Sequence, residues 1–242
     1  MNREYHKWHS PSLNREMELL IFGHAGARVL VFPTRSGRFF DYENWGMVDT
    51  LKSSIEQGHI QLYCVDSIDG ESFYCYWRSP ASRMKWHNLY ERYIIDEVIP
   101  LTRVKNNNIV MIAHGCSMGA YHAMTLAFRH PQHFGKVVAL SGRYDLTKPM
   151  GTFRDLLDGY YNDDVYYHMP SHFVPKMQDD VLLSQLKRME IIIAVGKTDA
   201  FKDNNVEYSD VLVQKNIPHK FDIWDEEAHH PKYWKQMIKM YL

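Results

Sequence analysis

The 242-residue sequence predicts a single α/β domain in which a mostly parallel sheet carries helices on both faces. Short apolar runs bounded by turn residues recur along the chain, as expected for strands that are buried on both faces. Segments with the three- and four-residue apolar spacing of helices alternate with most of these runs. The composition, 45% hydrophobic and 24% charged, is typical of a globular protein, so residues 1–242 are expected to form one domain.

The predicted elements of the first half place strands before the first helix. Strands are expected over 16–22, 28–32 and 60–65, with a helix over 44–57 between the last two. A second helix is expected from Pro80 to about Pro100, because proline interrupts a helix interior.

The second half repeats a strand–helix alternation with one interruption. Residues 146–185 carry three prolines and a tyrosine-rich run instead of this rhythm, and are expected to form a small insertion near the functional site. The remaining strands are expected over 109–113, 136–142, 190–195 and 220–224, and helices over 118–130 and about 202–215. A closing helix is expected to carry Tyr233, Trp234, Met237, Ile238 and Tyr241 on one stripe.

A G-x-S-x-G pattern, Gly115-Cys116-Ser117-Met118-Gly119, stands between a predicted strand and a predicted helix. This is the setting of a nucleophile elbow, a sharp turn that projects a serine hydroxyl from the edge of the sheet. Glycines two residues before and after the serine remove side chains that would collide in so tight a turn. Ser117 is therefore the predicted nucleophile, and a plain strand–helix turn is the alternative reading of the pattern.

A serine hydroxyl needs a base, and the base needs an acid that orients it. In elbow hydrolases the chain order is Ser, then Asp or Glu, then His. Asp199 follows the strand 190–195 and His229 follows the strand 220–224, so both fit this order at the carboxyl ends of strands. His230 and Asp203 are their closest rivals.

Two other chemistries are considered for the same residues. Cys116 adjoins the serine, but a small packing role is expected for it rather than a catalytic thiol. His229 and His230 follow Glu226 and Glu227, yet the spacing of a metal-binding helix is absent, so no metal is expected.

The oxyanion that develops in acyl transfer needs two N–H donors. The N–H after the serine, at Met118, is one, and the loop after the strand 28–32 supplies the other in elbow hydrolases. Arg35 is the residue predicted there, with Ser36 next. The aromatic stretches suggest substrate-binding side chains, for which the candidates are Phe39, Tyr74, Trp77, Tyr160 and Tyr161.

The net charge, the N-terminal segment and the cysteines indicate which partners and which location to expect. A net charge of −1 shows no basic excess, so neither nucleic acid nor a membrane is expected as a partner. The N-terminus has no apolar signal region, and no stretch approaches the roughly 20 apolar residues of a membrane span. Three cysteines form no disulfide framework, so we expect a cytoplasmic location. The sequence leaves the oligomeric state, including a homodimer, open.

Several motifs together resemble the putative-esterase branch of the α/β-hydrolases, which includes S-formylglutathione hydrolases, feruloyl and acetylxylan esterases and mycolyltransferases. The similar stretches are Ser10–Glu16 as the opening strand, Tyr93–Pro100 as a helix ending in E-L-I-P, Gly115–Ala123 as the elbow, Gly196–Asp199 as the acid turn and His229 with Trp234 as the closing motif. The sequence departs from the branch where Pro33-Thr34-Arg35 replaces a His-Gly dipeptide and where His229-His230-Pro231 replaces His-Asp-Trp.

The resemblance implies an α/β-hydrolase fold, hydrolysis of a small-molecule carboxylic ester, no cofactor, and His229 rather than His230 as the base. We therefore expect a serine carboxylesterase that acts on small or aryl esters. A thioesterase or an acyltransferase would use the same acyl-enzyme, and a non-catalytic hydrolase-like binding protein is the alternative from another class.

Overall fold

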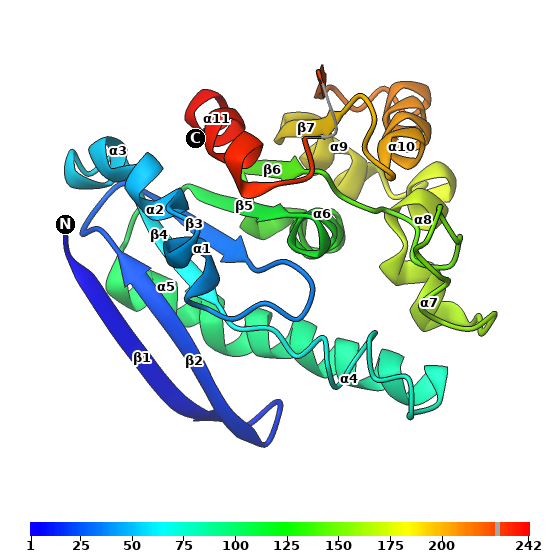
Figure 1. Ribbon diagram of the computed structural model, residues 1–242, viewed down its shortest axis with the longest axis horizontal. Coiled ribbons are helices and arrows are strands. Elements are labelled where there is room, and N and C mark those ends of the chain that lie inside the picture. Colours follow the sequence, from blue (N-terminus) through cyan, green and yellow to red (C-terminus); the bar gives the residue numbers. More distant parts are fainter. Residues whose placement is uncertain (226–227) are drawn as a thin grey trace.

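The computed structural model describes residues 1–225 and 228–242, and in this part eight strands form one sheet in the order β1-β2-β4-β3-β5-β6-β7-β8 (Figure 1). All neighbouring pairs from β4 to β8 are parallel, which confirms the predicted fold class. The strands are β1 (Arg3–Ser10), β2 (Arg15–Phe22), β3 (Ala27–Phe32), β4 (Ile60–Val65), β5 (Met111–Cys116), β6 (Lys136–Leu140), β7 (Glu190–Gly196) and β8 (Lys220–Trp224).

The sheet begins with an antiparallel hairpin that the sequence only partly predicted. Ser10 pairs with Arg15, so the stretch 10–16 expected as an opening strand is the end of β1, a turn over 11–14 and the start of β2. β1 alternates exposed and half-buried positions because it lies at the edge of the sheet, whereas every residue of β4 and β5 is buried. This contrast explains why apolar runs revealed the central strands and left β1 undetected.

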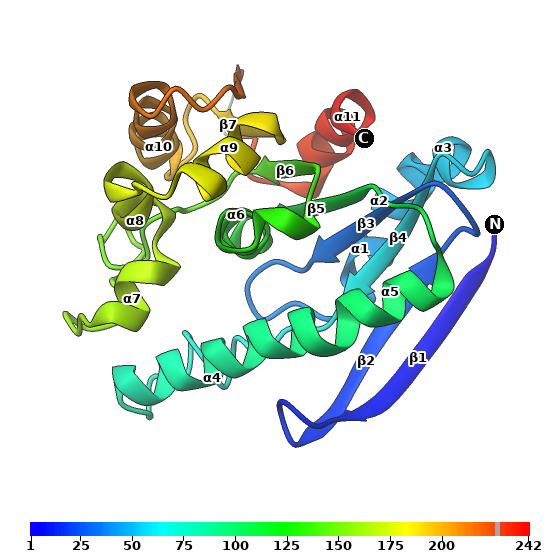
Figure 2. The same cartoon turned by 180° about the vertical axis from the view of Figure 1, so that it is seen from behind.

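Helices cover both faces of the sheet (Figure 1, Figure 2). One apolar cluster joins the sheet to α4, η1, α5, α6, α9 and α10, and a second joins the other face to α1–α3 and α11. The helical segments are α1 (Asp41–Asn44), α2 (Met47–Thr50), α3 (Lys52–Glu56), α4 (Pro80–Tyr93), the π-helical η1 (Ile94–Val98), α5 (Ile99–Lys105), α6 (Met118–Arg129), the 3-10 turn η2 (Pro131–His133), α7 (Asp163–His168), α8 (Pro170–Lys176), α9 (Asp180–Arg188), α10 (Lys202–Gln214) and α11 (Pro231–Tyr241).

Three expected boundaries were wrong. The helix expected over 44–57 is divided between three short helices. Gly46, with a φ of 70°, separates α1 from α2, and Leu51 separates α2 from α3. The helix expected to stop near Pro100 continues to Lys105, because the π-helical segment and the start of α5 accommodate the proline; Figure 2 shows α4 and α5 as one continuous helix. The strand expected over 109–113 begins only at Met111. Ile109 lies before the strand and is 91% exposed, so the apolar run starts outside the sheet.

The insertion expected over about 146–185 contains α7 and α8 and the start of α9. A third apolar cluster, with Leu146, Leu156 and Val165 among its members, packs this segment against α4 and α6. The buried guanidinium of Arg83 on α4 donates to the Leu156 carbonyl at 2.6 Å and pairs with Asp158. The insertion is thereby held beside the helix that follows the G-x-S-x-G turn.

Within residues 1–225 and 228–242, no helix combines the length and the apolar character that crossing a lipid bilayer requires.

His114 on β5 makes the protein sensitive to acid. Its Nδ1 donates to the Val138 carbonyl at 2.9 Å, so Nε2 accepts from the Tyr42 hydroxyl at 3.0 Å. Burial lowers the pKa of His114 to about 4, against about 6.5 in an unfolded chain. The neutral ring therefore stabilises the fold fully above pH 6.5, and this stabilisation is lost as the pH falls toward 4. At pH 5 the loss is about 2 kcal/mol.

We expect His114→Gln to reduce the difference in unfolding free energy between pH 7.5 and pH 5 by about 2 kcal/mol. Urea unfolding at both pH values measures this difference, with His24→Gln on the exposed surface as the control. Some acid sensitivity will remain, because burial also lowers the pKa of His87. An unchanged pH dependence in His114→Gln would contradict the assignment.

Candidate active site

The turn between β5 and α6 places Ser117 in strained backbone. Ser117 has φ 56° and ψ −120°, a conformation that side-chain-bearing residues rarely adopt. A Cβ on Gly115 would lie 2.2 Å from the Gly119 carbonyl carbon, and one on Gly119 would lie 2.3 Å from the Phe32 oxygen. Gly115 is therefore required for the tight turn from β5 into α6, and Gly119 for the close approach of α6 to β3, and the geometry is that of the predicted elbow.

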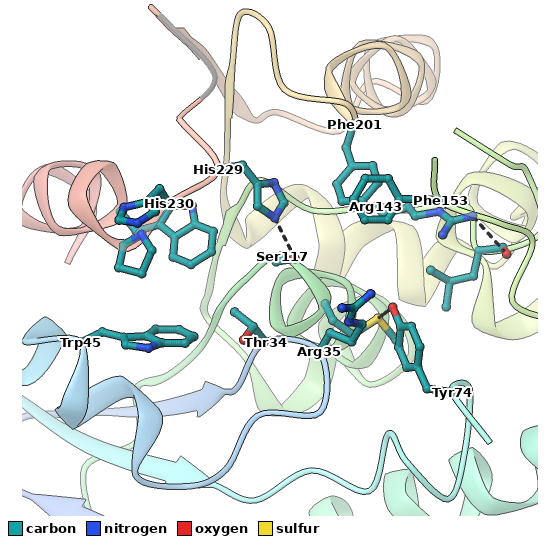
Figure 3. A pocket seen from close by; sticks show the side chains of 14 residues that line it. Thr34, Arg35, Trp45, Tyr74, Ser117, Arg143, Phe153, Phe201, His229 and His230 are labelled. Atoms are coloured by element: carbon teal, nitrogen blue, oxygen red, sulfur yellow. Dashed lines mark hydrogen bonds between the residues drawn. The ribbon is translucent and has the colours of Figure 1, made fainter. Parts of the chain in front are cut away.

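Ser117, His229 and Asp199 come together although they are far apart in the sequence. His229 Nε2 lies 3.0 Å from Ser117 Oγ, and His229 Nδ1 lies 2.9 Å from Asp199 Oδ2 (Figure 3 draws the first contact). A carboxylate accepts hydrogen bonds, so Nδ1 carries the proton and Nε2 is free to accept from the serine hydroxyl. This is the arrangement in which an imidazole can act as a general base toward a serine.

The surroundings of His229 hold its ring in this orientation. Phe201 and Trp234 contact it edge-on, with ring centroids 5.5 Å away in each case. The indole of Trp234 donates to Ser141 Oγ at 3.2 Å. Asp199 is buried, and its second oxygen accepts from the Phe201 N–H at 2.9 Å, so the carboxylate is also held in place.

The structure separates these residues from their rivals. His230 accepts from the Lys232 N–H at the start of α11 and bonds to neither Ser117 nor Asp199. The side chain of Asp203 is 89% exposed and pairs with Lys202. Cys116 is buried as a free thiol whose pKa is raised by that burial, which agrees with the packing role expected for it.

Ser117 opens into a cavity of about 510 Å³. Figure 3 shows Trp45 and His230 on one side of the serine and Arg35, Tyr74 and Arg143 on the other. The residues that line the cavity are Thr34, Arg35, Trp45, Tyr74, Ser117, Met118, Arg143, Leu146, Phe153, Phe201, His229, His230, Pro231 and Trp234.

Only one of the five aromatic residues expected to bind substrate lines this cavity, and it is Tyr74. Phe39 is instead buried in the apolar cluster of α1–α3 and α11, and the side chain of Trp77 is 82% exposed. Tyr160 packs against the insertion cluster, while the exposed Tyr161 contacts His172. Aromatic density in the sequence reflected packing and surface position at these four residues, because spacing alone does not reveal which face a loop presents.

Met118 and Arg35, the two residues predicted to hold the oxyanion, both line the cavity. The Ser36 N–H donates to Asp69 Oδ2 at 2.9 Å, so Ser36 is not free for this role. The other oxygen of Asp69 lies 3.1 Å from His122 Nε2 on α6. Asp69 thus ties the loop after β3 to the helix that begins beside Ser117.

Asp69 and Arg143 were not singled out from the sequence. Arg143 follows β6 at the same edge of the sheet as Ser117, and a charged residue directly after a buried parallel strand was the available signal. Asp69 lies in a turn after β4, where an isolated carboxylate is indistinguishable from an ordinary turn residue. Among the described residues no group of three or more His, Cys, Asp or Glu could hold a metal ion, and Glu226 and Glu227 lie outside these residues.

The parallel sheet, the elbow after β5 and the position of Ser117 at the carboxyl edge define the class of protein, the α/β-hydrolase fold. Residues 10–238 match the family model described as "Putative esterase", and the chain belongs to this family. It is accordingly an enzyme, a serine hydrolase of the carboxylic ester hydrolase class.

Solved structures share this fold over nearly the whole chain. A ferulic acid esterase superposes with a TM-score of 0.76 at 15% identity, covering 99% of this chain and 95% of the other. The S-formylglutathione hydrolase FrmB of Staphylococcus aureus gives 0.70 at 19% identity, with 99% and 95% covered. An S-formylglutathione hydrolase of Agrobacterium tumefaciens gives 0.77 at 16% identity, with 99% and 92% covered. No curated protein matches the sequence.

Proposed function

We propose that this protein is a serine carboxylesterase that hydrolyses small or aryl carboxylic esters through an acyl-enzyme on Ser117. The observation that carries the proposal is the pair of contacts, 3.0 Å and 2.9 Å, that link Ser117 through His229 to Asp199 beside the cavity. The five aromatic residues in the cavity lining, Trp45, Tyr74, Phe153, Phe201 and Trp234, suit an aryl or short acyl group.

In the proposed mechanism, Ser117 Oγ attacks the ester carbonyl carbon while His229 Nε2 takes the hydroxyl proton. The protonated imidazole then gives this proton to the departing alcohol oxygen, which leaves the acyl group on Ser117. Water attacks the acyl-enzyme, with its proton passing to Nε2, and the carboxylic acid departs as Ser117 is reprotonated. Asp199 stabilises the imidazolium in both halves of the reaction.

The oxyanion of each tetrahedral intermediate is proposed to accept from the Met118 N–H and the Arg35 N–H. Met118 is the first residue of α6, where the helix dipole also favours negative charge. Arg35 is favoured over Ser36 because the Ser36 N–H already donates to Asp69.

A p-nitrophenyl ester series from acetate to octanoate tests the proposal. We expect kcat/KM to be highest for acyl chains of about two to four carbons, because Leu146, Phe153 and Phe201 line the cavity around Ser117. Rates that rise steadily to octanoate would contradict the small-ester assignment. Turnover is measured beside Ser117→Ala, which separates enzymatic from spontaneous hydrolysis.

The two alternatives with the same acyl-enzyme differ only in the substrate or acceptor. Faster hydrolysis of a thioester than of the oxygen ester with the same acyl group would indicate a thioesterase. Formation of a new ester when an alcohol is added would indicate an acyltransferase. We also propose a cytoplasmic location, supported by three buried free cysteines, Cys64, Cys75 and Cys116.

A further inference from the structure

Two arginines line the cavity on the same side of Ser117. Arg35 comes from the loop after β3 and Arg143 from the segment after β6, and Figure 3 shows both beside Tyr74. None of the described residues that line the cavity is a carboxylate. The cavity wall therefore presents two positive charges without a negative one.

Arg143 is buried, with 4% of its surface exposed, and its hydrogen bonds go to backbone carbonyls alone. Its Nε donates to Asp145 O at 3.1 Å, and Nη2 donates to Lys148 O at 2.8 Å, Arg154 O at 2.9 Å and, more weakly, Leu146 O at 3.5 Å. Among the described residues none accepts a hydrogen bond from Nη1. The chain thus holds the guanidinium in a fixed orientation and leaves one of its nitrogens for another acceptor.

The carboxylates nearest to Arg143 are engaged elsewhere. Asp145 accepts from Thr147 and contacts His172 Nε2 at 3.0 Å, and Asp155 accepts from two backbone N–H groups of its own loop. Burial lowers the pKa of Arg143, because the charged guanidinium loses contact with water. A buried charge of this kind is stabilised when an anion pairs with it.

Arg35 is exposed, and its guanidinium lies 5.5 Å from the ring centroid of Tyr74. No carboxylate of the described residues lies within ion-pair distance of it, whereas Arg38 in the same loop pairs with Glu18 and Asp66. The ring of Tyr74 thus holds Arg35 at the cavity, and no carboxylate of the described residues neutralises its charge there.

Tyr74 connects this pair of arginines to the elbow. Its hydroxyl lies 4.0 Å from Met118 Sδ, and Met118 directly follows Ser117. Burial, and next the charge of Asp69, raise the pKa of Tyr74, while Arg35 and Arg143 both oppose that rise. Tyr74 thus contacts both Arg35, through its ring, and Met118, the residue next to the nucleophile, through its hydroxyl.

We propose that the substrate of this enzyme carries a carboxylate, which Arg143 and Arg35 bind while Ser117 attacks the ester carbonyl. This inference rests on the proposed esterase function and adds the charge of the substrate to it. A carboxylate accepts from a guanidinium through charge-assisted hydrogen bonds, which are stronger than neutral ones and gain strength away from water. A neutral ester of the same shape leaves Arg143 buried and unpaired.

Two matched pairs of esters test the charge on either side of the scissile bond. On the acyl side, p-nitrophenyl hydrogen adipate is compared with p-nitrophenyl 6-methylheptanoate, in which an isopropyl group replaces the carboxylate. On the alcohol side, 4-carboxyphenyl acetate is compared with 4-carbamoylphenyl acetate. We expect the wild type to prefer the anion in at least one pair by about 10- to 100-fold in kcat/KM.

The ratio of kcat/KM within a pair is the readout for the variants. Arg35→Gln is expected to lower the preference for the anion about tenfold. Arg143→Gln should abolish this preference, but it also removes the bonds to four carbonyls. If that variant does not fold, Arg35→Gln provides the test. Arg92→Gln, on the outer surface of α4, changes the net charge equally and should keep the wild-type ratio.

The outcomes distinguish this proposal from the esterase function. Hydrolysis that depends on Ser117 but shows no preference for the anion in either pair would overturn the carboxylate site and leave the esterase intact. If none of the four esters is hydrolysed, the esterase proposal fails. Calorimetric titration of the same esters into Ser117→Ala then tests whether Arg35 and Arg143 bind a carboxylate. Equal affinity for charged and neutral esters in that titration would overturn the carboxylate site.

Discussion

Replacing Ser117 by alanine is expected to lower kcat by about four to six orders of magnitude on any ester that the wild type hydrolyses. The Oγ atom lies 3.0 Å from His229 Nε2, and its loss removes the atom that attacks the ester and then carries the acyl group. The fold should be retained, because alanine removes one oxygen atom and Gly115 and Gly119 still allow the turn. Steady-state kinetics with p-nitrophenyl acetate measure the loss, and circular dichroism checks the fold.

Cys116→Ala is the matched control for Ser117→Ala, because it removes the neighbouring nucleophilic atom from the same turn. Cys116 is buried in the apolar cluster of α1–α3 and α11, and we expect its variant to keep activity within about tenfold of the wild type. A fluorophosphonate probe followed by mass spectrometry should label Ser117 in both the wild type and Cys116→Ala. Labelling that survives in Ser117→Ala, or activity lost only in Cys116→Ala, would contradict the assignment of the nucleophile.

Asp199→Asn is expected to lower kcat by about three to four orders of magnitude with little change in the fold. The Asp199 carboxylate accepts the Nδ1 proton of His229 at 2.9 Å, whereas an asparagine amide can donate to Nδ1 and move the ring proton to Nε2. In that tautomer Nε2 has no lone pair to accept the serine proton, although every heavy atom keeps its place.

Asp203→Asn is the control for this change, since it makes the same substitution four residues further along the chain. The Asp203 side chain is 89% exposed and does not contact His229, so we expect kcat to stay within about twofold of the wild type. Similar losses in the two variants would indicate a general effect of removing negative charge and would contradict the specific role of Asp199.

The chain order of the serine, the acid and the histidine could be predicted from the sequence, because each residue follows a predicted strand. Buried parallel strands appear as short apolar runs, and Ser117 and Asp199 each follow one of them, while His229 follows the parallel edge strand β8. Since the carboxyl ends of parallel strands meet at one edge of a sheet, the three residues could be placed in one region before any distance was known. The steric requirement for Gly115, whose Cβ would meet Gly119, is likewise local to the turn, whereas Gly119 is required by the approach of α6 to Phe32 on β3.

The boundaries of helices and the edge strand of the sheet were predicted less well, and each of these errors has a physical reason. β1 lies at the edge of the sheet with one face exposed, so its sequence lacks an apolar run. Pro100 does not end its helix, because a π-helical segment before it accommodates the proline. The helix expected over 44–57 breaks at Gly46, where a positive φ is easily adopted.

The sequence by itself determined the fold class, the elbow and the order of serine, acid and histidine, because these follow from apolar periodicity and from sterics within a few residues. Only the tertiary structure decided which neighbouring side chains face the cavity. It set His229 against Ser117 rather than His230, brought Tyr74 rather than Phe39 or Trp77 to the wall, and turned Arg143 toward the same cavity. Such choices depend on how loops from distant strands pack together, and adjacent residues in a loop point in different directions with no period that a sequence could reveal.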